Sequence, residues 1–78
     1  MKLPIQLKTG EFLALVTIET NPEFERPTVD FLLKPLPKSF YPIFVAFEKD
    51  KVKVYCLCTN QEDFVCNLAR TGYKTELI

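Results

Sequence analysis

The sequence predicts an α+β domain in which one helix packs on a face of a mostly antiparallel sheet. Strand-like alternation on both sides of a turn predicts the sheet, first in residues 2–8 and 11–19 and again in residues 43–48 and 51–58. Capping signals at both ends of residues 60–71 predict the helix. A single helix covers only one face of such a sheet, so we expect the second face to meet a loop or another subunit.

The first predicted hairpin joins residues 2–8 to residues 11–19 through Thr9 and Gly10. Apolar and polar residues alternate in both strands, and one face of each strand is apolar: Leu3, Ile5 and Leu7, then Phe12, Ala14, Val16 and Ile18. Glycine supplies the positive φ that a two-residue hairpin turn requires. The pattern therefore favours a tight hairpin at the start of the chain.

Residues 28–34 are predicted to form a middle strand, because Val29, Phe31 and Leu33 share one face at strand spacing. The segment is short, and a helix fits its apolar pattern nearly as well, so that alternative stays open. The segment that follows, residues 35–42, contains three prolines and is expected to be extended or looped.

The second predicted hairpin pairs residues 43–48 with residues 51–58 around Lys49 and Asp50. The register that this turn implies sets Glu48 opposite Lys51, Phe47 opposite Val52, Val45 opposite Val54 and Ile43 opposite Cys56. One face of the hairpin is then apolar throughout and is expected to face the core. The other face is mixed, because lysines alternate there with aromatic rings.

Residues 60–71 are predicted to form a helix that packs on a face of the sheet. Thr59 followed by Glu62 fits a capping box, and Gly72 fits the left-handed residue that ends a helix. An apolar stripe at helical spacing consists of Phe64, Val65, Leu68 and Ala69. Residues 73–78 alternate again and are predicted to close the sheet as a short strand.

Composition and charge are those of an ordinary globular protein with one core, so we expect a single compact domain over residues 1–78. Ten basic and ten acidic side chains give a formal net charge of zero, which weakens bulk attraction to nucleic acid or to an anionic membrane. No stretch approaches the roughly 20 apolar residues of a membrane span. Three cysteines, an odd number in so short a chain, are typical of a reducing compartment. We therefore expect a cytoplasmic protein that does not bind membranes.

The cysteines are the first candidates for chemistry, because Cys56 and Cys58 share one side of a predicted strand. A tetrahedral zinc site needs four ligands, or three and a water, and the sequence has no histidine. Cysteine on an apolar face behaves as a small hydrophobic residue, so we expect Cys56 and Cys58 to pack in the core. We expect the protein to bind neither a metal nor a cofactor. Without a histidine base, and with only Gly10 and Gly72 for a phosphate-binding loop, we do not expect an enzyme.

These patterns together favour a small non-catalytic protein-interaction module, such as a regulator or inhibitor that binds a larger partner, or a module that associates with itself. The predicted partner-binding residues are Leu36, Phe40 and Tyr41, because large apolar side chains in a loop either fold back on the core or meet a partner. The alternative is a single-stranded nucleic-acid binder. Its candidate residues are Phe44, Lys51, Lys53 and Tyr55, because aromatic rings interleaved with lysines suit base stacking and phosphate contacts.

Overall fold

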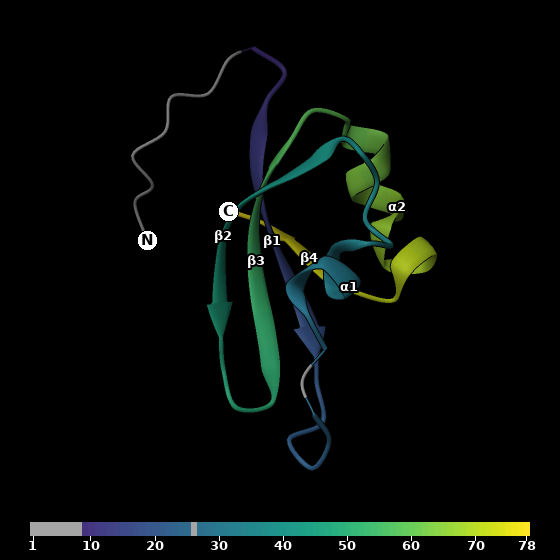
Figure 1. Cartoon of the computed structure of the whole chain (residues 1–78). Coiled ribbons are helices and arrows are strands. Elements are labelled where there is room, and N and C mark those ends of the chain that lie inside the picture. The colour runs from purple at the N-terminus through teal and green to yellow at the C-terminus, as the bar shows by residue number, and fades with distance from the viewer. Residues whose placement is uncertain (1–8, 26) are drawn as a thin grey trace.

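The described residues form four strands and two helices, which follow one another along the chain (Figure 1). The computed structural model describes residues 9–25 and 27–78. The elements are β1 (Phe12–Glu19), α1 (Val29–Leu33), β2 (Phe40–Phe47), β3 (Lys51–Cys58), α2 (Gln61–Thr71) and β4 (Lys74–Leu77). The strands form one sheet in the order β2-β3-β1-β4, and every neighbouring pair is antiparallel. The predicted α+β class is therefore confirmed.

Both helices lie on the same side of the sheet, and the core lies between them and that face (Figure 1). Its buried apolar members are Ala14, Val16, Ile18, Leu32, Phe40, Val52, Val54, Cys56 and Cys58. Side chains alternate along a strand, so every second residue of β1 and β3 is buried. No described helix covers the opposite side of the sheet, which we call the open face.

The order β-α-β-β-α-β, with β1 and β3 in the centre of the sheet, is the connectivity of ferredoxin-like domains. The first helix is short here, at five residues. This connectivity supports many unrelated functions, so it assigns none to the chain. Neither described helix has the length and apolar character needed to cross a bilayer.

The second predicted hairpin is present as β2 and β3. Its register matches the prediction where Phe47 lies opposite Val52 and Val45 lies opposite Val54. The predicted pairing of Ile43 with Cys56 is wrong, because Pro42 occupies that position and the register shifts directly after it. Proline has no N–H to donate to a neighbouring strand, so it is tolerated on edge strands and at bulges. β2 is an edge strand, and its register shifts directly after Pro42.

The other predicted hairpin is described only in part. Its first strand, residues 2–8, lies outside the described residues, so that pairing stays a prediction. Its second strand is present as β1, and the turn residue Gly10 has the positive φ expected of it, 87°. β1 pairs with β3 along its whole length and with β4 from Ala14 to Thr17, which makes it a central strand.

The prediction of a middle strand over residues 28–34 is wrong, because this segment forms the helix α1. Thr28 caps it: the Thr28 Oγ1 accepts a hydrogen bond from the Phe31 N–H at 3.3 Å, and the Leu32 N–H donates to the Thr28 carbonyl at 3.1 Å. The turn buries Leu32 and leaves Phe31 65 % exposed. In a segment of five residues, apolar spacing does not distinguish a strand from a helix. The Thr28 cap and the burial of Leu32 therefore determine that the segment is helical.

The predicted C-terminal helix is present as α2, with a different N-cap. Asn60, and not Thr59, is the capping residue, because its Oδ1 accepts a hydrogen bond from the Asp63 N–H at 3.1 Å. The end of the helix is as predicted, since Gly72 has a φ of 76° and its N–H closes the last turn. β4 then follows within the predicted strand at residues 73–78.

The predicted apolar stripe of α2 is not the face that packs on the sheet. Val65 and Leu68 are 69 % and 58 % exposed, whereas Asn67 is fully buried. Phe64 does reach the sheet, where its ring meets the Phe12 ring edge-on with centroids 5.4 Å apart. The helix is therefore rotated relative to the prediction, so that an amide lies on its inner side and two aliphatic side chains lie on its surface.

Candidate functional site

Two of the three cysteines are placed where their reactivity is low. Cys56 and Cys58 lie on the covered side of β3, fully buried, and Cys66 is half-buried on α2. Burial raises the pKa of the Cys56 thiol to about 12, with the nearby Cys58 adding to the shift, and burial raises the pKa of Cys58 to about 11. Both thiols are therefore protonated at neutral pH, and a thiol is a far weaker nucleophile and metal ligand than a thiolate. Within the described residues, no three His, Cys, Asp or Glu side chains gather to hold a metal ion.

The raised thiol pKa values make the free energy of unfolding depend on alkaline pH. Unfolded thiols titrate near 9.0, so above that pH the unfolded chain binds fewer protons than the folded one. The stabilising contribution is complete below pH 9 and is lost as the pH rises through the folded pKa values, by up to about 1.4 kcal/mol per pH unit for each thiol. Urea denaturation at several alkaline pH values measures this slope. A Cys56→Val variant should show a shallower slope, and equal slopes would contradict the assignment.

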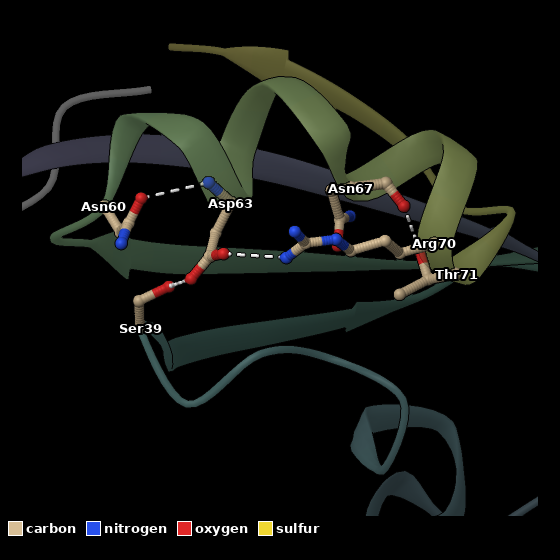
Figure 2. A network of polar contacts seen from close by, with 6 residues as sticks. All are labelled: Ser39, Asn60, Asp63, Asn67, Arg70 and Thr71. Carbon is tan, nitrogen blue, oxygen red and sulfur yellow. Dashed lines mark hydrogen bonds and ion pairs between the residues drawn. The ribbon is translucent and has the colours of Figure 1, made fainter.

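The inner side of α2 carries a polar network that holds the helix in place (Figure 2). The Ser39 hydroxyl donates a hydrogen bond to the Asp63 Oδ2 at 2.7 Å, and the Arg70 Nη1 donates to the Asp63 Oδ1 at 2.8 Å. Both carboxylate oxygens are therefore occupied by contacts within the chain. The network joins α2 to the residue that precedes β2, which accounts for the rotation of the helix.

Asn67 makes a second set of polar contacts, toward β4 and the end of α2. Its Nδ2 donates a hydrogen bond to the Thr75 Oγ1 at 2.7 Å, and the Thr71 hydroxyl donates to the Asn67 carbonyl at 2.8 Å (Figure 2 shows the second bond). The Asn67 Oδ1 is buried and has no hydrogen-bond partner among the residues that the structure describes. An unpaired buried oxygen costs stability, so Asn67 fixes the docking of α2 at some expense in free energy.

The predicted partner-binding residues separate in the structure. Phe40 is 4 % exposed and belongs to the core, and Leu36 is partly buried against it. Tyr41 is 69 % exposed and lies on the open face, opposite Leu57 of β3. The proline segment therefore folds back on the core through two of its large side chains and offers the third to solvent.

The residues predicted for nucleic-acid binding do come together on the open face. Phe44 lies opposite Tyr55, with ring centroids 5.9 Å apart and the ring planes tilted by 53°. Lys51 and Lys53 follow on the same side of β3, and both contact Glu48, with Nζ–O distances of 3.9 and 3.1 Å. The hydrogen bond from Lys53 to Glu48 raises the pKa of Lys53. The two ammonium groups are therefore partly neutralised by a carboxylate of the same hairpin.

The open face is apolar in one half and charged in the other. The register sets Leu13 opposite Leu57 and Leu15 opposite Tyr55, so leucines from β1 adjoin the two aromatic rings. We call this cluster the apolar half, and it consists of Leu13, Leu15, Tyr41, Phe44, Tyr55 and Leu57. The leucines were not among the predicted site residues. Alternation along β1 and β3 already placed them away from the core, but only the strand order shows that they adjoin one another.

A second accessible apolar surface lies where β4 adjoins α2. Leu77 of β4 is 65 % exposed, and Leu68 of α2 is 58 % exposed. Leu77 also lines a shallow pocket together with Phe12 and Phe64, between the starts of β1 and α2. This surface is on the covered side of the sheet and is separate from the apolar half.

No family model, no curated protein and no solved structure matches this chain significantly. The function is therefore argued from the geometry of the described residues.

Proposed function

We propose that this chain is a small non-catalytic binding domain that docks on another protein through the apolar half of its open face. A domain of this kind acts by occupying a surface of a larger partner, as regulators and inhibitors do. The observation that carries the proposal is the contiguity of leucine and tyrosine side chains across three neighbouring strands, on the side of the sheet that no described helix covers.

The composition of the open face supports an interface rather than a solvated surface. An antiparallel sheet with helices on one side normally turns polar side chains toward water on the other. Here that alternation holds around Lys51 and Lys53 and along β4, and it fails in the apolar half. Protein interfaces combine an apolar centre rich in aromatic residues with a polar rim, and the two halves of this face supply both parts.

Tyr41 and Phe44 are suited to test the proposal, because they are 69 % and 47 % exposed and can be changed without disturbing the core. A Tyr41→Lys/Phe44→Lys variant should keep the thermal stability of the parent and lose the partner. The measurement is affinity capture from a lysate of cells that make the protein, followed by calorimetric titration of the recovered partner. We expect binding to weaken at least about tenfold, since aromatic residues dominate interface energies.

The control is Val65→Lys, which adds a lysine at a 69 % exposed position on α2, on the other side of the sheet. This variant should bind the partner as the parent does. If the recovered protein binds all three chains equally, the apolar half is not the docking surface.

Single-stranded nucleic acid is the second candidate ligand, and the pairing of Phe44 with Tyr55 beside Lys53 is the observation that favours it. Exposed rings on a sheet stack on bases, and neighbouring lysines contact phosphates. The zero net charge and the contacts of both lysines with Glu48 place it behind the first proposal. Amide chemical shifts in a titration with mixed short oligonucleotides test it. Shifts at these residues that fade with salt would support it, and an unchanged spectrum would exclude it.

A further inference from the structure

The outer edge of β4 has backbone groups that are available for pairing. The Ile78 N–H donates a hydrogen bond to the Leu13 carbonyl of β1 at 3.1 Å. Because hydrogen-bonding direction alternates along an antiparallel strand, Lys74 and Glu76 also turn their backbone groups toward β1. Thr75 and Leu77 therefore turn their N–H and C=O groups outward, where no strand of the described residues lies.

The other edge of the sheet is protected against pairing, and this edge is not. β2 carries Pro42 and a register shift, both of which interrupt a ladder. β4 has no proline and no bulge among its four residues. A lysine on an edge strand usually opposes pairing with another sheet. In β4 the charge of Lys74 can be neutralised by Glu76, two positions later.

The side chains of β4 are self-complementary when the strand is read in both directions. We propose that two copies of this chain join antiparallel along their β4 edges, with Thr75 on the two-fold axis, into one continuous sheet. Lys74 of each copy then lies opposite Glu76 of the other. The two Thr75 residues exchange backbone hydrogen bonds, and the Leu77 N–H meets the Tyr73 carbonyl of the second copy.

Charge selects this register over its neighbours. Backbone hydrogen bonds form only where residues with outward N–H and C=O groups lie opposite one another. The nearest alternative registers of the two β4 strands therefore place the two-fold axis at Lys74 or at Glu76. Either shift sets like charges directly opposite each other across the axis, which is destabilising. In the single chain the Lys74 Nζ and the Glu76 Oε1 are 3.5 Å apart, with side chains 72 % and 53 % exposed, so both are free to exchange partners.

The apolar surface beside β4 agrees with the same arrangement. Antiparallel pairing about a two-fold axis perpendicular to the sheet keeps both copies of α2 on one side of the joined sheet. Leu77, which is 65 % exposed in the single chain, lies on that side two residues from the axis and becomes covered. Leu68, which is 58 % exposed, belongs to α2, the helix that adjoins β4 on the same side. The inference goes beyond the function proposed above, because it uses a different surface and a different partner, a second copy of this chain.

Charge reversal tests the inference. Sedimentation equilibrium from micromolar to millimolar concentration should show the parent chain approaching twice its mass of 9.0 kDa. Lys74→Glu alone and Glu76→Lys alone should each weaken association at least about tenfold, because each sets two like-charge pairs across the axis. The double variant Lys74→Glu/Glu76→Lys restores opposite charges and should regain the dimer, and a mixture of the two single variants should form the heterodimer.

Amide exchange provides the second readout. The outward N–H groups of Thr75 and Leu77 should become protected as the concentration rises, while the exposed turn residue Asp50 should not change. Both reversed positions are exposed, so the variants are expected to fold, and circular dichroism checks this. A parent chain that stays monomeric at millimolar concentration would overturn the inference. A dimer that tolerates both single reversals, or that the double variant does not restore, would overturn it as well.

Discussion

Replacing Phe40 with alanine is expected to lower the free energy of unfolding by about 3–5 kcal/mol, which is enough to unfold much of a small domain at room temperature. Phe40 is the first residue of β2, lies opposite Cys58 and is 4 % exposed, so its removal takes a buried aromatic ring out of the core. Urea denaturation followed by circular dichroism measures the change.

Tyr41→Ala is the matched control, because it removes an aromatic ring from the next residue of the same strand. Tyr41 is 69 % exposed, so this change should stay within about 0.5 kcal/mol. The pair also separates a core role from a binding role in the segment that was predicted to meet a partner. A change at Phe40 as small as the one expected at Tyr41 would show that Phe40 is not a core residue.

Replacing Asn67 with aspartate is expected to destabilise the fold by about 3 kcal/mol or more at neutral pH. The Asn67 side chain is fully buried, and its Oδ1 has no hydrogen-bond partner among the described residues, so an ionised carboxylate at this position loses most of its hydration. Burial raises the pKa of the introduced carboxyl in the folded state. The loss should therefore be small below pH of about 4, where both states are protonated, and should grow as the pH rises above it.

Chemical denaturation at acidic and neutral pH provides the test. Asn60→Asp introduces the same charge at the exposed N-cap of α2, where aspartate is as good a cap as asparagine. That variant should be as stable as the parent at neutral pH. A charge at position 67 that costs no stability at neutral pH would mean that the Asn67 site opens to water.

The sheet was predictable where two independent signals agreed. The register of β2 and β3 follows both from the turn at Lys49 and Asp50 and from the alternation that places Val52 and Val54 in the core. The predicted register was wrong at Ile43, because the proline before it interrupts the hydrogen bonding between the two strands. Local pattern could not show that β1 lies between β3 and β4, since the strand order depends on contacts between distant segments.

The helices show why apolar spacing alone is a weak guide in a small domain. In α1, a single capping threonine outweighs the strand-like spacing of the segment. In α2, Val65 and Leu68 form the more apolar stripe, yet the contacts of Asp63 with Ser39 and of Asn67 with Thr75 turn that stripe outward. These partners lie 24 and 8 residues away, beyond the reach of a helical-wheel argument. The leucines of the apolar half were missed for a related reason, because the strand order brings them together.

The place of β1 between β3 and β4 has a consequence for synthesis on the ribosome. The β2–β3 hairpin is local and can form as soon as residue 58 has left the exit tunnel. β1 is made before either of its partners, and its pairing with β4 must wait until residue 77 has emerged. Nearly the whole domain therefore stays incompletely paired during translation, and the sheet closes only after its last strand is free. A nascent chain arrested before residue 74 should be digested rapidly by protease, and one extended past the tunnel should resist.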